Sequence, residues 1–259
     1  MHVLVLGGVA EARDLAGRLA AAPGRVVTLS LAGRTRAPRL PQGCAVRIGG
    51  FGGAEGLACW IAAEGVAALV DATHPFARRI SAHAEAAAAE TGTPLVVLER
   101  PPWTEVPGDR WIRVPDMPAA AAALGGLLGG GPGPGSGPAL LAIGRQELGA
   151  FRALPGARCL VRSVEPPDPA DLPPGAETLL ARGPFDAAAE RALLAARGVV
   201  AVVAKNSGGD ATYGKIAAAR ALGLPVILVD RPARPGAATT VDAALARLDR
   251  LRPPKRRQA

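Results

Sequence analysis

The chain has 259 residues, of which 49% are apolar and 3% aromatic, and its formal net charge is +8. This length allows two domains that each bury a core. The positive charge suits nucleic acid or a multiply anionic small ligand, but the chain lacks the aromatic residues interleaved with basic ones that single-strand binding usually uses. We therefore expect an anionic metabolite as ligand and no nucleic acid.

The cysteines and the apolar runs indicate the compartment. Cys44, Cys59 and Cys159 are isolated and odd in number, so the sequence predicts neither a disulfide framework nor a metal site, and we expect core thiols in a reducing cytoplasm. No apolar run reaches the roughly 20 residues of a membrane span, and the N-terminus lacks a basic signal region. We expect a cytoplasmic protein without membrane contact, as a monomer or a weak homo-oligomer.

The first twenty residues predict a buried strand, a glycine turn and an amphipathic helix. Residues 3–6 form a continuous apolar run, and Gly7, Gly8 and Val9 follow it. Glycines at this point let a phosphate approach the backbone at the start of a helix. The full Gly-x-Gly-x-x-Gly fingerprint is absent, so these residues fit an ordinary βα unit equally well.

The second predicted strand, residues 25–30, bears on the choice of cofactor. NAD-binding units carry an acidic residue about 20 positions beyond the glycines, and none stands here. Ser30, Gly33, Arg34 and Thr35 stand there instead, and they are suited to a 2′-phosphate. This favours NADPH over NADH, although Arg34 also fits a surface arginine.

A polar cluster follows the predicted strand at residues 66–70. Asp71, Ala72, Thr73 and His74 come directly after it. Because ligands of open α/β sheets bind at the carboxyl ends of strands, we expect this cluster to face the same crevice as the glycine turn. The alternative is that Asp71 or Thr73 caps the next helix, residues 76–90, and that His74 lies on the surface.

Further elements complete a first domain of residues 1–100. Strands are predicted at 44–48 and 94–98 and a helix at 54–64, and the Pro-Pro segment after Arg100 suits an interdomain connection. Arg100 could hold a carboxylate and Trp103 could pack on a flat ring, although Trp103 fits plain interdomain packing as well.

The second half repeats the α/β alternation, which predicts a second domain of residues 101–251. Strands are expected at 139–143, 159–164 and 199–204. Helices are expected at 116–128, after residues 144–147 to about residue 154, and after the capping residue Asp186. Residues 129–138 form a low-complexity loop, and 252–259 a basic, solvated tail. The fold class is α/β, with two Rossmann-like or flavodoxin-like domains, mainly parallel sheets and a cleft between them.

A second polar cluster follows the strand at 199–204. It contains Lys205, Asn206, Ser207 and Gly208, again in front of a predicted helix. The chain has three lysines among 30 basic residues, and two of them lie within residues 205–215. This placement favours a functional role for Lys205.

Seven short runs together resemble the precorrin-6A reductase family of cobalamin biosynthesis. The resemblance spans about residues 3–232 and rests on runs at 7–13, 30–35, 71–77, 100–103, 144–145, 182–185 and 203–209. Asp-Ala-Thr-His-Pro-Phe-Ala at 71–77 and Lys-Asn-Ser-Gly-Gly at 205–209 are the specific ones. The family commonly has threonine where Val9 stands, which puts one hydroxyl contact to the cofactor in doubt.

The resemblance implies an NADPH-dependent reductase that converts the precorrin-6A or cobalt-precorrin-6A macrocycle, a tetrapyrrole edged with carboxylates, to precorrin-6B. The expected cofactor-binding residues are Gly7, Gly8, Val9, Ser30, Gly33, Arg34, Thr35, Asp71, Ala72, Thr73 and His74. The expected substrate-binding residues are Arg100, Trp103, Arg145, Arg182, Lys205, Asn206, Ser207 and Gly208. His74 and Lys205 are the candidate catalytic proton donors, with water as the alternative.

Two other classes of protein remain open from the residues alone. A short-chain-dehydrogenase-like reductase would carry a Tyr-x-x-x-Lys pair, whereas Tyr213 and Lys215 have a different spacing. A non-catalytic module that binds a dinucleotide or a tetrapyrrole is the other alternative.

Overall fold

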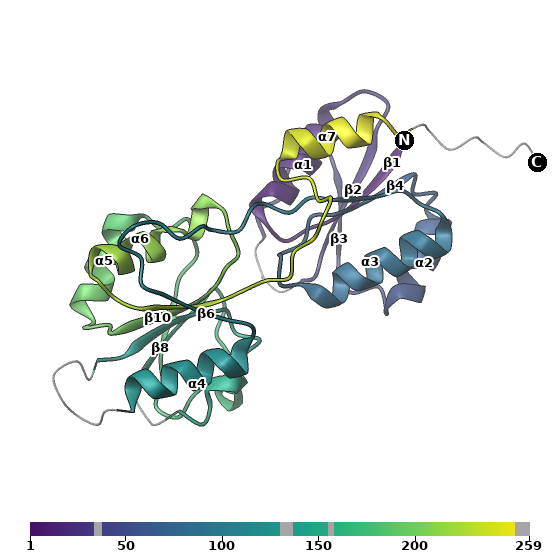
Figure 1. The fold of residues 1–259 in the computed structure, drawn as a ribbon. Helices are drawn as coiled ribbons and strands as arrows, with labels where there is room; N and C mark the ends of the chain where they lie inside the picture. The colour runs from purple at the N-terminus through teal and green to yellow at the C-terminus, as the bar shows by residue number, and fades with distance from the viewer. Residues whose placement is uncertain (34–37, 130–136, 155–157, 252–259) are drawn as a thin grey trace, which may run out of the picture. The chain divides into compact units, whose positions relative to one another are not determined.

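The structure, a computed structural model, describes residues 1–33, 38–129, 137–154 and 158–251, and the chain divides into two compact units (Figure 1). The first unit contains residues 1–101 and the chain from Ala233 onward, and the second is Pro102–Pro232. The predicted second domain, 101–251, differs from this division because residues 233–251 return to the first unit, where Ala244 and Leu248 enter its core. The predicted tail, 252–259, lies outside the described residues.

A five-stranded, all-parallel sheet forms the centre of the first unit. Its strand order is β3-β2-β1-β4-β5. The strands are β1 (His2–Leu6), β2 (Val26–Leu31), β3 (Ala45–Ile48), β4 (Ala68–Asp71) and β5 (Leu95–Val97). The chain moves outward from β1 to β3 and then restarts beside β1 with β4. The strand order therefore reverses between β1 and β4, which is where open α/β sheets bind ligands.

Helices cover both faces of this sheet, as the continuous apolar run in β1 predicts. The helices are α1 (Ala10–Ala21), α2 (Ala54–Ala63), α3 (Arg78–Thr91) and α7 (Val241–Asp249). Val3 and Val5 point to the core made with α1 and α7, whereas Leu4 and Leu6 point to the core made with α2 and α3. In Figure 1 the yellow α7 lies beside the purple α1, so the last helix completes a layer begun by the first. Alternating side chains of one strand thus join two helical layers.

The second unit is built on a six-stranded, all-parallel sheet with the order β6-β11-β10-β7-β8-β9. Its strands are β6 (Trp111–Val114), β7 (Ala139–Ala142), β8 (Cys159–Ser163), β9 (Glu177–Leu180), β10 (Ala201–Lys205) and β11 (Val226–Val229). The chain runs from β7 outward to β9 and then restarts beside β7 with β10. The strand order of this sheet therefore reverses between β7 and β10.

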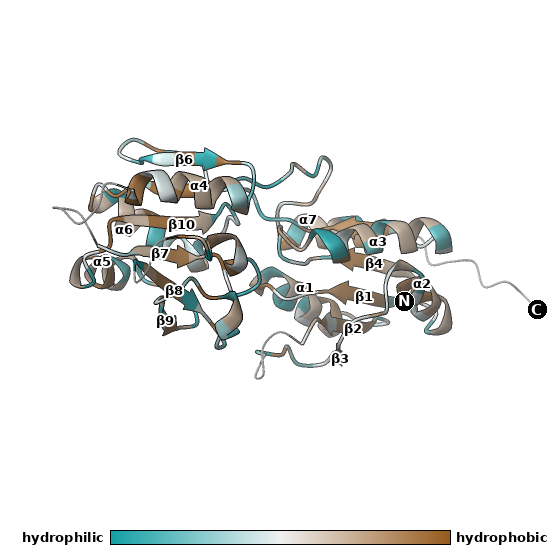
Figure 2. Cartoon of the chain, turned by 90° about the horizontal axis from the view of Figure 1, so that it is seen from below, coloured by the Kyte–Doolittle hydropathy of each residue, from teal (hydrophilic) through white to brown (hydrophobic). Residues whose placement is uncertain are grey.

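Helices also cover both faces of the second sheet. They are α4 (Met117–Leu128), α5 (Ala187–Ala196) and α6 (Gly214–Ala221), with short 3₁₀ turns η1 (Leu148–Phe151), η2 (Pro169–Asp171) and η3 (Asp210–Thr212). Figure 2 shows the central strands β7 and β10 in hydrophobic colours, whereas the edge strand β6 combines hydrophilic and hydrophobic ones. The expected cap of α5 is confirmed, since the Asp186 carboxylate accepts hydrogen bonds from the amides of Ala188 and Ala189.

Two predicted helices differ from the structure. The helix expected up to residue 154 is only the 3₁₀ turn η1. The helix expected from residue 76 begins at Arg78, because the Ala77 amide donates to the His74 carbonyl and closes a turn before it. His74 therefore lies in a compact turn between β4 and α3.

A buried ion pair fixes the returning segment to the first sheet. Arg234 Nη1 lies 2.7 Å from Asp71 Oδ2, and the Asp71 side chain has no exposed surface. The amide and hydroxyl of Thr73 donate to the other carboxylate oxygen. Burial acts to raise the pKa of Asp71, but the hydrogen bonds from Thr73, Ser81 and Arg234, with the charge of Arg234, outweigh it and hold that pKa below its ordinary value.

Replacing this carboxylate gives a pH-dependent test of the fold. Asp71→Asn should lower the free energy of unfolding at neutral pH by about 3 kcal/mol, because the charged contacts of the buried carboxylate with Arg234 and Thr73 are lost. Since the folded-state pKa is lowered, the contribution of Asp71 is present above its unfolded pKa of about 3.9 and is lost as the pH falls through the folded pKa. Denaturant titrations should therefore show a constant difference from wild type above about pH 5 and a shrinking one below about pH 4.

The matched control is Asp242→Asn, because Asp242 pairs with Arg18 but its side chain is 79% exposed. Its effect should stay within about 0.5 kcal/mol at every pH. An Asp71→Asn difference that is the same at pH 3 as at pH 7 would show that the charge of Asp71 is not what stabilises the unit.

Candidate functional site

The glycine turn after β1 forms an open seat at the start of α1. A Cβ at Gly7 would lie 2.7 Å from Leu29 Cδ1, so only glycine packs there without a shift, and the Gly7 amide donates to the Ser30 carbonyl. Gly8 has φ +139°, and a Cβ on it would meet nothing within 4 Å. Val9 caps α1 without a side-chain hydrogen bond. A side chain at Gly8 would thus extend into open space, next to a helix start that has no side-chain cap, and such a helix start is suited to an anion.

The end of β2 lies directly beside this seat. Ser30 is buried and pairs in register with Leu6, while Gly33 has φ +72°. Of the predicted 2′-phosphate ligands, Arg34 and Thr35 lie outside the described residues. The Ser30 carbonyl accepts the Gly7 amide, so Ser30 borders the glycine turn, and Gly33 follows three residues later.

The loop after β4 lies on the other side of the seat. The Ala72 amide donates to the Leu6 carbonyl, which fixes the start of this loop beside the end of β1. Thr73 is held by Asp71, as described above. His74 is partly exposed, and its Nδ1 accepts a hydrogen bond of 3.3 Å from the Phe76 amide. This contact assigns the proton of neutral His74 to Nε2.

Arg234 is a residue of this region that the sequence reasoning missed. It comes 163 positions after Asp71, and its guanidinium contacts Asp71, Ser81 and Glu85. Two of its partners, Asp71 and Ser81, also lie within hydrogen-bond distance of Thr73. Arg234 therefore organises the loop that carries Thr73 and His74, and the Asp71 carboxylate faces the protein interior.

At the strand-order reversal of the second sheet, Lys205 meets an acidic residue that the sequence analysis did not select. Lys205 ends β10, Glu147 follows β7, and their side chains form an ion pair. Lys205 keeps 15% of its side chain exposed and Glu147 keeps 42%. Beyond Lys205, Ser207 is buried, and Gly208 and Gly209 have φ of +66° and +74°. Two such residues in succession explain why the run needs both glycines.

Trp103 and Asn206, both predicted to bind substrate, are interlocked in the interior of the second unit. The Asn206 side chain accepts from the Trp103 amide at 2.8 Å and donates to the Trp103 carbonyl at 3.2 Å. The Trp103 indole donates to the Gly209 carbonyl, and Lys215 Nζ lies 4.7 Å from the centre of its ring. Both residues are less than a tenth exposed. They hold the loop after Lys205, while their contact with a substrate stays a prediction.

The three predicted substrate arginines have different surroundings. Arg145 is partly exposed and donates to the Pro166 carbonyl, and Arg182 is exposed. Arg100 is bound to Glu11, at the first turn of α1. Arg145 and Arg182 belong to the second unit and Arg100 to the first.

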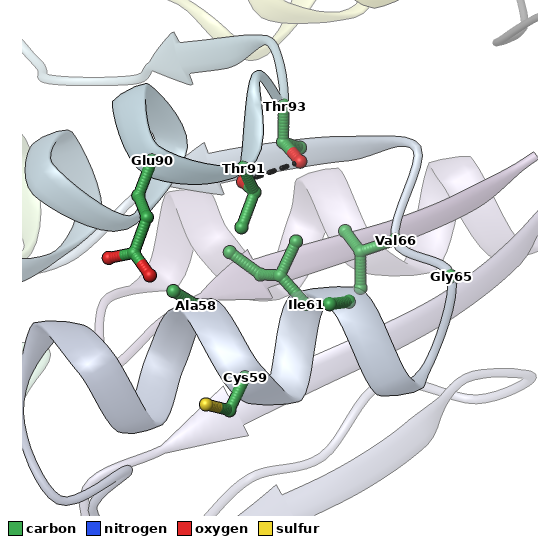
Figure 3. A pocket seen from close by; sticks show the side chains of 9 residues that line it. Ala58, Cys59, Ile61, Gly65, Val66, Glu90, Thr91 and Thr93 are labelled. Carbon is green, nitrogen blue, oxygen red and sulfur yellow. Dashed lines mark hydrogen bonds between the residues drawn. The ribbon is translucent and has the colours of Figure 1, made fainter.

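A surface pocket lies elsewhere on the first unit (Figure 3). Its lining comes from the ends of α2 and α3 and includes Cys59, Val66, Glu90 and Thr93. Val66 precedes β4 and Thr93 precedes β5, so the pocket lies at the amino ends of the strands. None of the residues predicted from the sequence to bind a ligand contributes to it.

The expectation that all three cysteines are core thiols is wrong for Cys59. Cys159 is buried, and burial raises the pKa of its thiol to about 11, but Cys59 is exposed and is not a core residue. Within the ranges that the structure describes, no group of three or more His, Cys, Asp and Glu residues could hold a metal ion. In those same ranges, no helix is both long and apolar enough to cross a membrane.

Comparison with known proteins places the chain in one family. The family model for precorrin-6x reductase CbiJ/CobK matches residues 2–249. A precorrin-6A reductase of Sinorhizobium sp is 49% identical over 250 residues, which cover 96% of this chain and 92% of the relative. A cobalt-precorrin-6A reductase of Methanothermobacter thermautotrophicus is 33% identical, covering 90% of this chain and 77% of the relative.

A solved structure agrees with these sequence relatives. It is a CobK precorrin-6A reductase, 44% identical to this chain, and it superposes with a TM-score of 0.83 over 96% of both chains. The α/β fold with two all-parallel sheets is thus shared with a protein of that name. Together with the family match over residues 2–249, this shows that the chain belongs to the precorrin-6x reductase family.

Proposed function

We propose that this protein is a precorrin-6A reductase that uses NADPH to reduce the macrocycle to precorrin-6B in cobalamin biosynthesis. The observation that carries the proposal is the 49% identity with a precorrin-6A reductase across 96% of this chain. Identity with the cobalt-precorrin-6A reductase is lower, at 33%. This difference favours the cobalt-free macrocycle as the substrate.

The residues of the first unit fit a bound dinucleotide. The tight packing of Gly7, the open space at Gly8 and the free first turn of α1 suit a pyrophosphate. No acidic residue stands at positions 30–33 to bind the ribose hydroxyls of NADH. Ser30, Gly33, Arg34 and Thr35 would instead hold the 2′-phosphate of NADPH.

The reaction adds a hydride and a proton across one conjugated double bond, and bound NADPH supplies the hydride. The chain must align the two flat partners and deliver the proton. As an imidazolium, His74 could donate it from Nε2, and the neutral imidazole that remains would accept the Phe76 amide at Nδ1. Asp71 acts here as a positioning residue, since both oxygens of its carboxylate accept hydrogen bonds, one from Thr73 and the other from Arg234. Lys205 and water remain the alternative donors.

The polar cluster of the second unit suits the carboxylates at the edge of the macrocycle. Lys205, Arg145 and Arg182 supply positive charge, and Ser207 and Gly208 follow the same strand end. In the structure the Lys205 ammonium is paired with the half-exposed Glu147. A substrate carboxylate could share or replace this contact, because Glu147 keeps 42% of its side chain exposed and can turn toward solvent.

The first alternative function finds little support in the second unit. The Tyr213 hydroxyl accepts a hydrogen bond from Arg220, and Lys215 is buried and donates to the Thr212 carbonyl. These two side chains therefore bind other residues of the second unit. They do not form the tyrosine and lysine pair of a short-chain-dehydrogenase-like site. The second alternative, a module that binds without reacting, is tested by the following assay.

The direct test of the proposed function is the oxidation of NADPH in the presence of a tetrapyrrole. Purified protein with precorrin-6A should consume one NADPH for each macrocycle reduced, followed by the absorbance of reduced nicotinamide and by the mass of the product. Cobalt-precorrin-6A, run in parallel, should turn over more slowly. Binding of both ligands without NADPH oxidation would support the non-catalytic module instead.

The choice of cofactor can be tested at Arg34. Arg34→Ala should weaken NADPH binding about tenfold and leave NADH binding within about twofold, because only NADPH carries the 2′-phosphate. Titration of nicotinamide fluorescence measures both constants. Equal effects on the two cofactors would remove Arg34 from the 2′-phosphate site.

The role of Lys205 can be separated from cofactor binding. Lys205→Ala should raise the KM for the macrocycle or lower turnover by about tenfold or more, because it loses a charged hydrogen bond. NADPH affinity should not change. Arg197→Met is the matched control, since it removes one positive charge from an exposed pair in the same unit. If Lys205→Ala and Arg197→Met both have wild-type kinetics, Lys205 takes no part in the reaction.

A further inference from the structure

Two motifs that the proposed function leaves partly unexplained meet inside the first unit. Glu11 belongs to the run at 7–13, and Arg100 begins the run at 100–103. Arg100 Nη1 lies 2.8 Å from Glu11 Oε2. Their side chains are only 17% and 29% exposed, respectively, so this ion pair is less screened than a surface pair.

The position of Glu11 makes its charge relevant to the seat. Glu11 is the second residue of α1 and lies in its first turn, directly after the Gly7, Gly8 and Val9 segment. When no cofactor is bound, a carboxylate at this position stabilises α1 through the helix dipole. The same carboxylate repels a pyrophosphate that binds to the first-turn amides, because like charges at short range oppose each other.

Arg100 is held at this place by the backbone on its N-terminal side. The Leu98 amide donates to the Asp71 carbonyl, and the Glu99 amide donates to the Ala238 carbonyl. Residues 98 and 99 are therefore fixed at the carboxyl edge of the first sheet, immediately before Arg100. The guanidinium thus reaches Glu11 from an anchored backbone.

We propose that Arg100 is a positioning residue of the cofactor seat, which cancels the charge of Glu11 so that the dinucleotide pyrophosphate can bind. This inference rests on the proposed function, because it requires a dinucleotide at the glycine turn. It moves Arg100 from the substrate carboxylates, where the sequence placed it, to the cofactor. The interaction that carries it is Arg100 with Glu11 at the first turn of α1.

A double-mutant cycle on cofactor binding tests the proposal without any macrocycle. Fluorescence titrations with NADPH and with NADH would compare wild type, Arg100→Met, Glu11→Gln and the double variant. Arg100→Met should weaken both cofactors by about tenfold, because both carry the pyrophosphate. Glu11→Gln should bind at least as tightly as wild type. The double variant should return to within about threefold of wild type.

Each other result has a distinct meaning. A double variant as weak as Arg100→Met would overturn the proposal, since Arg100 would then act on the cofactor or the fold directly. An effect on NADPH but not on NADH would overturn it in favour of a 2′-phosphate contact. Unchanged binding of both cofactors in Arg100→Met, together with a raised KM for the macrocycle, would return Arg100 to the substrate.

Two controls distinguish a loss of the Arg100 interaction from a folding defect and from a failure of the proposed function. Arg18→Met removes the same charge from the opposite end of α1, where Arg18 pairs with Asp242, and should leave binding within about twofold. Thermal unfolding of each variant shows that it is folded. Wild-type protein that binds neither cofactor would overturn the proposed function as well, whereas failure of the cycle alone overturns only the role of Arg100.

Discussion

The buried charge of Asp71 is the constraint on which the first unit depends. A carboxylate without exposed surface at the end of a central strand is stable only when it is paired and fully hydrogen-bonded. Arg234 and Thr73 meet that requirement from two different segments. One side chain therefore joins the end of β4, the loop that carries His74 and the segment that leads to α7. The same contacts that stabilise the unit also shape the loop beside the glycine turn.

The sequence predicts most closely those buried strands that consist of a continuous apolar run. The strand expected at residues 3–6 is β1, and the run at 199–204 overlaps β10. The edge strand β6 contains Arg113, which pairs with Asp230 on its exposed surface, so its sequence lacks such a run. The sequence analysis names no helix over residues 241–249 and assigns them to the second domain, whereas the structure has α7 there, in the first unit. An amphipathic pattern would show which face of that helix is buried but not which sheet buries it.

The sequence located the polar residues at the strand ends but not their partners. Lys205, Asp71 and Arg100 each pair with an oppositely charged residue more than 50 positions away, namely Glu147, Arg234 and Glu11. Periodicity and local motifs describe neighbours within a few turns of chain, so they contain no information on such pairs. The sequence therefore predicts a ligand contact for each polar residue at a strand end, whereas several of these residues form hydrogen bonds or ion pairs with partners that are distant in the sequence.

Burial separates the polar residues that build the site from those available to a ligand. Asp71, Asn206 and Trp103 are almost fully buried, and their hydrogen bonds connect backbone segments that are distant in sequence. A ligand could reach them only by breaking those bonds, and a buried group left without its partner is costly. His74 and Lys205 keep exposed surface at the edges where the two strand orders reverse. Buried pairs thus hold the loops, and our proposal assigns the contacts with a ligand to the exposed residues that those loops carry.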